Sequence, residues 1–247
     1  MNMEISFIII AYNEEKYIEQ CVRSVFLQRN APSYEVIVVD NNSTDNTYNI
    51  VRSKFPQARL VRESKQGMSN ARNRGAKEAR GALLVFLDAD DIAPQDYGKK
   101  ILAYFAKNPK CVGISGPSKF YDLPKRYKFV EFVDFKILYP MVGELFLKTL
   151  SKKGALFNGA NIAVKKWAFE KIGGFTTSIV FYGEDADLAQ RLMKHGKIAF
   201  LQNIWVFSSA RRLLKGNPVR EGLRYVFNYL WFFMKKKSKG KSYDAVR

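Results

Sequence analysis

Residues 82–91 read ALLVFLDADD, an apolar run that ends at the aspartates Asp88, Asp90 and Asp91. An unbroken apolar run of this length indicates a strand that is covered on both faces, as strands of parallel sheets are. Carboxylates two positions apart on an extended segment can converge on one hard divalent cation such as Mg²⁺. The stretch therefore predicts a buried strand that ends in a candidate metal site, Asp88 and Asp90. For Asp91, capping of the next helix is the alternative.

The residues before this stretch alternate between strand and helix patterns. The sequence predicts further strands at residues 5–10, 35–39 and 58–62. It predicts helices that begin at Asn13, at Ser43 or Thr44, at Ser69 or Asn70, and near Pro94. Repeated strand–helix units of this kind predict an α/β fold with a Rossmann-like, mostly parallel sheet.

Polar residues follow three of the predicted strands at the point where each one ends. Tyr12, Asp40 and Asp88 are these residues. In open parallel sheets, ligands bind beyond the carboxyl ends of the strands. We therefore expect these side chains to share one rim of the sheet and to face a ligand.

The second half of the chain has a different composition, with many aromatic residues and lysines after residue 116. We expect a helix from Val133 onward, a strand at residues 155–164, and helices at residues 167–172 and 185–195. The composition predicts three parts: residues 1–116, residues 117–217, and a basic tail at residues 218–247.

A second acidic group lies at Gly183-Glu184-Asp185, at the start of a predicted helix. Acidic residues are favoured there by the helix dipole, so capping is one interpretation. However, capping needs one acid, and Glu184, Asp185 and Asp187 are all present. A carboxylate held at a helix start is also well placed to act as a general base.

Four segments together resemble family 2 glycosyltransferases with the GT-A fold. They are FIIIAYNEEK at residues 7–16, VDNNSTDNT at 39–47, ARNRGAKEARGALLVFLDADD at 71–91, and GGF with YGEDADLAQRL between residues 173 and 192. The likeness covers about residues 5–201, in the order of the family. It implies an inverting enzyme that transfers a sugar from a nucleoside-diphosphate sugar to an acceptor hydroxyl of a glycan or lipid-linked acceptor, with Mg²⁺ or Mn²⁺ as cofactor.

The resemblance implies that residues 1–116 form the nucleotide-sugar-binding half and that residues 117–217 form the acceptor-binding and catalytic half. It also implies roles for individual residues. Asp185 would be the catalytic base, with Glu184 as its neighbour and the second candidate, and Asp90 would bind the metal with support from Asp88. The donor would be contacted by Ala11, Tyr12, Glu14, Asp40, Arg72, Asp88, Ala89 and Asp90, with Arg72 reaching the nucleotide. Many relatives have Pro or Thr before the tyrosine, whereas this sequence has Ile10-Ala11. This difference bears on which nucleobase of the donor is recognised.

The charge of the chain predicts anionic partners. Among 247 residues, 41 are Lys or Arg and 23 are Asp or Glu, which gives a net charge of +18. Nucleotides, phospholipid surfaces and nucleic acids are all compatible with such a charge. For Arg211 and Arg212, which follow a predicted strand, we weigh binding of a diphosphate or phosphorylated acceptor against a solvated basic turn.

The remaining features concern the location of the protein. Cys21 and Cys111 lie in apolar patterns, so we expect buried, reduced thiols in a cytoplasmic protein. Neither a signal peptide nor a membrane-spanning segment is expected. Residues 218–234 have an apolar helical periodicity and precede Lys235, Lys236 and Lys237, so this tail is expected either to bind an anionic membrane at its inner face or to pack on the core.

Two other function classes are compatible with parts of the sequence. A sugar-phosphate nucleotidyltransferase would need a glycine-rich triphosphate loop after the first strand, whereas residues 11–15 read AYNEE. A basic protein that binds nucleic acid or membrane without catalysis would fit the charge. However, an acidic rim would repel phosphates in the absence of a metal, so nucleic acid is not the expected partner.

Overall fold

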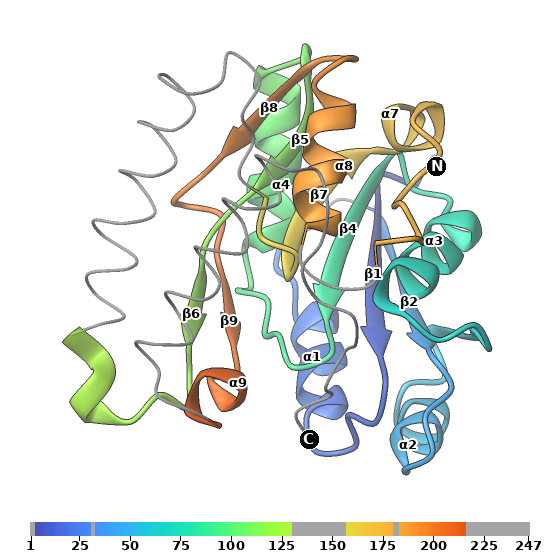
Figure 1. Ribbon diagram of the computed structural model, residues 1–247, viewed down its shortest axis with the longest axis vertical. Coiled ribbons are helices and arrows are strands. Elements are labelled where there is room, and N and C mark those ends of the chain that lie inside the picture. The colour runs from blue at the N-terminus through green and yellow to red at the C-terminus, as the bar shows by residue number, and fades with distance from the viewer. Residues whose placement is uncertain (1–2, 31–32, 130–156, 180–182, 216–247) are drawn as a thin grey trace.

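The computed structural model describes residues 3–30, 33–129, 157–179 and 183–215 (Figure 1). Within them, a seven-stranded sheet has the order β3-β2-β1-β4-β7-β5-β8. In that order the strands are Arg59–Arg62, Tyr34–Asp40, Ile5–Ala11, Leu83–Asp88, Asn161–Lys165, Cys111–Ser115 and Lys197–Phe200. All run in one direction except β7, which is antiparallel to both of its neighbours. The predicted α/β fold with a mostly parallel sheet is confirmed.

Helices cover both faces of this sheet (Figure 1). They are α1 (Ile18–Phe26), α2 (Thr47–Lys54), α3 (Met68–Glu78), α4 (Tyr97–Lys107), α7 (Lys166–Lys171) and α8 (Glu184–Leu192). A short pair, β6 (Ser118–Phe120) and β9 (Val206–Ser208), lies beside the sheet and leads into α9 (Arg211–Leu214); a 3₁₀ turn, η1, spans Lys125–Tyr127.

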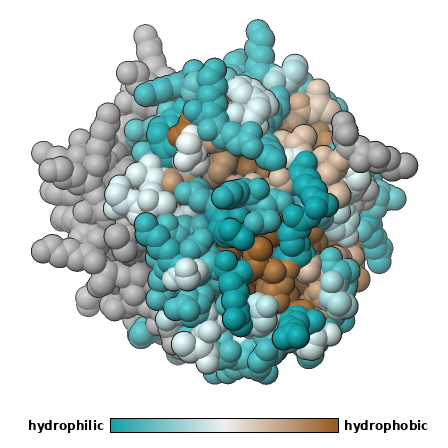
Figure 2. Space-filling view, turned by 90° about the vertical axis from the view of Figure 1, so that its right-hand side faces the viewer, coloured by the Kyte–Doolittle hydropathy of each residue, from teal (hydrophilic) through white to brown (hydrophobic). Residues whose placement is uncertain are grey.

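The strands are encoded by unbroken apolar runs because a separate hydrophobic core lies on each face of the sheet. Ile5, Phe7 and Ile9 of β1 point into one core with α1 and α4, whereas Ile8 and Ile10 point into a second core with α3, α7 and α8. Successive side chains of a strand point to opposite faces of the sheet. Because neither face of β1 is exposed to solvent, both sets of side chains are buried. The side of the molecule that faces the viewer in Figure 2 is mainly hydrophilic, with a smaller apolar area.

Two expected helix caps are wrong. Asn13 has a left-handed backbone (φ of +54°) and precedes α1 by several residues, and its Oδ1 accepts a hydrogen bond from the amide of Thr44 at 2.7 Å. Helix α2 begins at Thr47, and Asp45 accepts a hydrogen bond from its amide at 3.0 Å. Asn13, Ser43 and Thr44 instead form hydrogen bonds between the loop after β1 and the loop after β2: the Asn13 amide donates to Ser43 Oγ, and Asn13 Nδ2 donates to Thr44 Oγ1. These side chains are therefore not used as helix caps.

The second half of the chain contributes to the same sheet. Strand β7 pairs with β4, and β8 pairs with β5, so the sheet continues across the predicted boundary at residue 116. β7 is shorter than the expected strand at 155–164 and begins at Asn161. The expected helix from Val133, and the tail at residues 218–247, lie outside the described residues.

Two further observations bear on the expectations from the sequence. Cys21 and Cys111 are both buried and free, as expected. In the part of the chain that the structure describes, no helix is both long enough and apolar enough to cross a bilayer.

Candidate active site

The register of the central strands brings the predicted donor residues to one rim. Ala11 lies opposite Asp40 in the β1–β2 pair, and Ile10 lies opposite Asp88 in the β1–β4 pair. Three carboxyl ends therefore meet at the lower end of the sheet in Figure 1. The sequence prediction that Tyr12, Asp40 and Asp88 share this rim is confirmed.

Asp40 is buried at the rim and keeps one oxygen available. Its Oδ2 accepts a long hydrogen bond of 3.4 Å from the amide of Ser43, whereas Oδ1 has no hydrogen-bond partner. A buried, unpaired carboxylate oxygen is costly unless a ligand group pairs with it. The unpaired Oδ1 makes Asp40 a candidate to accept a hydrogen bond from a ligand at this rim.

Ala11 and Ala89 lie at the same level, but their side chains belong to the core beneath the rim. They are 2% and 3% exposed, and both pack in the cluster shared with α1 and α4. Their predicted contact with the donor stays a prediction, since neither residue has appreciable exposed surface in this structure.

Asp91 fixes the turn that presents Asp88 and Asp90. Its Oδ2 accepts a hydrogen bond from the Asp88 amide at 2.8 Å, and Oδ1 accepts one from the hydroxyl of Ser208. Burial, followed by the charges of Asp88 and Asp90, raises the pKa of Asp91 well above its ordinary value. Asp91 thus stabilises the turn from within. Its alternative role as a cap of α4 is wrong, because that helix begins at Tyr97.

Asp90 faces a cationic side chain from the far end of the described chain. Its Oδ2 lies 3.2 Å from Nη2 of Arg211, and the same nitrogen is within hydrogen-bond distance of Oε1 of Glu14. Burial raises the pKa of Asp90 and of Glu14, and Arg211 opposes the rise in both. Burial acts to lower the pKa of Arg211, but Glu14 and Asp90 raise it above its ordinary value.

Arg72 connects the donor rim to the second acidic group. Its side chain is buried, with Nη2 at 3.1 Å from Asp88 Oδ1 and Nη1 at 3.3 Å from Glu184 Oε1. Nη2 also donates to the carbonyl oxygen of Gly159 at 2.9 Å. Both terminal nitrogens of the guanidinium thus have internal partners, whereas Nε has none, and the contact between Arg72 and the nucleotide stays a prediction.

Helix α8 places Glu184 and Asp185 beside this guanidinium. The helix begins directly after Gly183, whose φ of +107° is a conformation that favours glycine. A Cβ atom added to Gly159 would lie 3.5 Å from Arg72 Nη2, 3.7 Å from Glu184 Oε1 and 3.9 Å from Asp185 Oδ2. The absence of a side chain at Gly159 therefore leaves room directly in front of both carboxylates.

The environment gives Asp185 the properties of a base near neutral pH. Burial, followed by the charge of Glu184, raises the pKa of Asp185 to about 7, while the amide of Ala186 and the charge of Arg72 act in the opposite direction. The carboxyl group is buried, although part of the residue as a whole remains exposed. A carboxylate with a pKa near the working pH combines an available base form with a useful affinity for a proton.

The structure also identifies site residues that the sequence reasoning missed. Gly159 had no assigned role, and the partners of Arg211 could not be named, because Glu14 lies 197 positions away. A glycine shortly before a buried strand was the available signal for Gly159.

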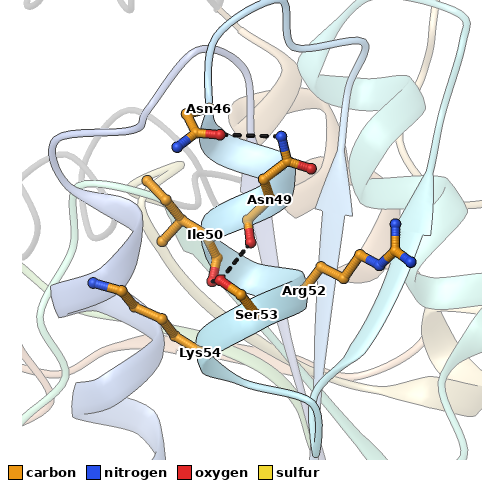
Figure 3. Close-up of a pocket in the computed structure, with 6 residues that line it drawn as sticks. All are labelled: Asn46, Asn49, Ile50, Arg52, Ser53 and Lys54. Atoms are coloured by element: carbon orange, nitrogen blue, oxygen red, sulfur yellow. Dashed lines mark hydrogen bonds between the residues drawn. The ribbon is translucent and has the colours of Figure 1, made fainter.

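A surface hollow on α2 lies apart from these residues. It has a volume of about 670 Å³ and is lined by one helical segment: Asn46, Asn49, Ile50, Arg52, Ser53 and Lys54 (Figure 3). Two of its polar side chains are hydrogen-bonded within the segment: Ser53 Oγ donates to the carbonyl of Asn49 at 2.7 Å, and Asn49 Nδ2 donates to Asn46 Oδ1 at 3.0 Å. None of the predicted site residues lines it, so we assign no function to this hollow.

Comparisons with known proteins agree with the fold and the order of the motifs. The family model described as glycosyl transferase family 2 matches residues 6–173, which is more than half of the chain. The chain therefore belongs to glycosyl transferase family 2, as its resemblance predicted.

The relatives are longer than this chain. An uncharacterized glycosyltransferase from Haemophilus influenzae is 27% identical over 190 residues, covering 77% of this chain and 62% of that protein. A validoxylamine A glucosyltransferase from Streptomyces hygroscopicus subsp. limoneus is 27% identical over 218 residues, covering 78% of this chain and 48% of that protein. The chain thus spans less than two thirds of the length of either relative.

Solved structures show the same fold. The mannosyltransferase PcManGT from Pyrobaculum calidifontis, in complex with GDP-Man and Mn²⁺, superposes with a TM-score of 0.68 at 24% identity, over 85% of this chain and 58% of that one. TarS 1–349 from S. aureus, in complex with UDP-GlcNAc, gives a TM-score of 0.60 at 21% identity, over 84% of this chain and 58% of that one. At these identities the likeness establishes the fold.

Proposed function

We propose that this chain is an inverting glycosyltransferase that moves a sugar from a nucleoside-diphosphate sugar to an acceptor hydroxyl. The observation that carries the proposal is the link from Asp88, at the donor rim, through Arg72 to the carboxylates of α8. Asp88 and Glu184 pair with different terminal nitrogens of this guanidinium, and we take the rim at Asp88 as the donor side and Asp185, next to Glu184, as the base. Family membership and the nucleotide sugars in PcManGT and TarS support the same donor class.

Asp185 is the proposed base. It takes the proton of the acceptor hydroxyl as that oxygen forms a bond to the anomeric carbon, and the bond from this carbon to the diphosphate oxygen breaks. The electron pair of the broken bond leaves with the nucleoside diphosphate. A single displacement of this kind inverts the anomeric configuration, and it needs one base on the acceptor side.

The carboxylates at the rim fit a divalent cation. Asp88 and Asp90 offer hard oxygen ligands, and within the described ranges no group of three acidic, histidine or cysteine side chains could hold a metal alone. Mg²⁺ commonly uses one or two carboxylates together with phosphate oxygens and water. The cationic Arg211 at Asp90 indicates that this position favours positive charge. A bound Mg²⁺ or Mn²⁺ would stabilise the charge of the leaving diphosphate.

The nucleoside is proposed to lie at Asp40, near Tyr12, where the unpaired Oδ1 is available to accept a hydrogen bond. Glu14 lies on the neighbouring loop, held by a hydrogen bond from its amide to Thr47 Oγ1 at 2.7 Å. The acceptor is proposed to be a glycan or a lipid-linked hydroxyl, reached at the inner face of an anionic membrane.

A donor screen tests the proposal. The protein is incubated with a panel of nucleoside-diphosphate sugars and Mn²⁺ or Mg²⁺, and thermal stability and release of nucleoside diphosphate are measured. A true donor present at 100 times its Kd should stabilise the fold by about 2.7 kcal/mol. If no donor in the panel stabilises the protein or is turned over, the proposal is contradicted.

A further inference from the structure

The guanidinium of Arg211 is enclosed at the donor rim. Its Nη2 is shared by Glu14 Oε1 and Asp90 Oδ2, and the ring centroid of Tyr17 lies 4.5 Å from its Cζ. Only 12% of the side chain is exposed, and Nε has no hydrogen-bond partner. Arg211 therefore pairs with two largely covered carboxylates on two different loops.

The backbone around Arg211 is held in place by other residues. Ser208 donates to Asp91, and Asp122 accepts hydrogen bonds from the Ser209 hydroxyl at 2.5 Å and from the Ala210 amide at 2.6 Å. These contacts do not involve the guanidinium. The Arg211 side chain can therefore change partners while the β9–α9 connection stays where it is.

Arg211 and a divalent cation compete for the same carboxylate oxygen. Two positive groups next to Asp90 Oδ2 would repel each other strongly in a partly buried site. We infer that Arg211 is an internal counter-cation for Asp90, that a divalent cation displaces it, and that the displaced guanidinium then binds the donor diphosphate. This inference rests on the proposed function, because it takes the diphosphate of the donor as the new partner of Arg211.

The exchange has an energetic consequence for the order of binding. A cation that arrives alone must break the Arg211–Asp90 ion pair, which weakens its binding. A cation that arrives with a diphosphate gives the planar guanidinium a new anionic partner, which it can bind through two hydrogen bonds. Cation and nucleoside diphosphate should therefore each raise the affinity for the other, as reciprocal coupling requires.

The test measures binding of Mn²⁺ by electron paramagnetic resonance of the free ion, with no nucleotide and then with GDP or UDP. The proteins are wild type, Arg211→Gln and Lys215→Gln, with circular dichroism as a check on folding. Lys215→Gln removes the same charge from an exposed position just after α9 and so controls for general electrostatics. Without nucleotide, Arg211→Gln should bind Mn²⁺ about tenfold more tightly than wild type, because a lost charge-assisted hydrogen bond is of that order.

With a nucleoside diphosphate present, the sign should reverse: Arg211→Gln should bind the Mn²⁺–diphosphate complex more weakly than wild type. Opposite signs in the two measurements are not expected of a residue that only stabilises the loop. An unchanged or lower Mn²⁺ affinity in Arg211→Gln without nucleotide would overturn the inference, as would an equal gain in Lys215→Gln. Either result is compatible with sugar transfer by the wild type, so the proposed function is tested separately by turnover.

Discussion

Nη1 of Arg72 lies 3.3 Å from Oε1 of Glu184, although the two residues are 112 positions apart. Arg72 belongs to α3, on the donor side, and Glu184 is the first residue of α8, which carries the proposed base. The other terminal nitrogen of Arg72 reaches Asp88 and the carbonyl of Gly159. One buried guanidinium thus holds the two acidic groups of the site at a fixed separation.

Replacement of Arg72 should destabilise the fold. In Arg72→Gln, the charges of Asp88 and Glu184 lose their buried partner, and breaking a buried ion pair typically costs about 3–5 kcal/mol. The free energy of unfolding in urea measures the effect. Arg74→Gln is the matched control, because Arg74 lies in the same helix and pairs with Glu78 at the surface, where such pairs contribute about 0–1 kcal/mol. Equal losses in the two variants would contradict a special role for Arg72.

Asp90→Asn should remove the effect of metal on donor binding while the fold is retained. The substitution keeps the size of the side chain but removes the charge that a divalent cation needs, and the adjacent turn is held by Asp91. Thermal stability is measured with donor in the presence of Mn²⁺ or of a chelator. Asp96→Asn, at an exposed pair with Lys100, is the control and should keep the full metal effect. An intact metal effect in Asp90→Asn would exclude Asp90 as a ligand.

The transfer rate should depend on pH through Asp185. Burial raises the pKa of its carboxyl to about 7, and only the deprotonated form can accept a proton from the acceptor. As the pH falls through about 7 the base becomes protonated, so the rate should fall by about tenfold for each further unit below this value, whereas it should level off above it. The measurement is the initial transfer rate at saturating donor between about pH 5 and pH 9. A rate that stays constant through neutral pH would contradict this assignment.

The parts of the fold that the sequence predicts are those governed by burial. The runs at residues 5–10 and 82–87 are apolar because both faces of β1 and β4 are covered, so the strands and the rim at their ends follow from the pattern. Glu184 and Asp185 could be placed at a helix start for a similarly local reason, since acids are favoured in the first turn.

The parts that could not be predicted depend on partners far away in the sequence. Asn13 and Asp91 are both good caps by residue type, yet Thr44 and Ser208 bind them over 31 and 117 positions. Local propensity cannot decide against such tertiary hydrogen bonds. The same holds for Arg72 and Arg211. An arginine can lie in solvent or be buried among carboxylates, and for these two the packing of elements far apart in the sequence decides for burial.

Residues after Asn217 are predicted to mediate binding to anionic membranes. The apolar periodicity of residues 218–234 and the following lysines fit an interfacial helix, and each basic residue near an anionic surface contributes about 1 kcal/mol. The full chain should float with vesicles that contain phosphatidylserine, and a chain ending at Asn217 should not. Replacement of Lys235, Lys236 and Lys237 by Gln should reduce flotation without removing the apolar segment. Failure of the full chain to float would contradict the prediction.

Asp185→Asn is predicted to abolish most sugar transfer without loss of donor binding. Asparagine preserves the shape of the side chain at the start of α8, so the fold should be retained, but its amide cannot accept the proton of the acceptor. A positioned base contributes about 10²–10⁴-fold to a rate, and the loss should be of that size. Donor affinity should change little, because Asp40, Asp88 and Asp90 lie at the ends of β2 and β4.

Glu184→Gln separates the two carboxylates of the pair. Glu184 is bound to Arg72, so its proposed part is to hold the guanidinium and to raise the pKa of Asp185, rather than to take the proton. Glu184→Gln should therefore lower the rate less than Asp185→Asn does, and it should shift the pH profile toward lower pH because a neighbouring negative charge is lost. Transfer rates, donor affinities and circular dichroism of both variants decide the matter. If Asp185→Asn transfers sugar at nearly the wild-type rate, or if Glu184→Gln causes the larger loss at unchanged stability, Asp185 is not the base.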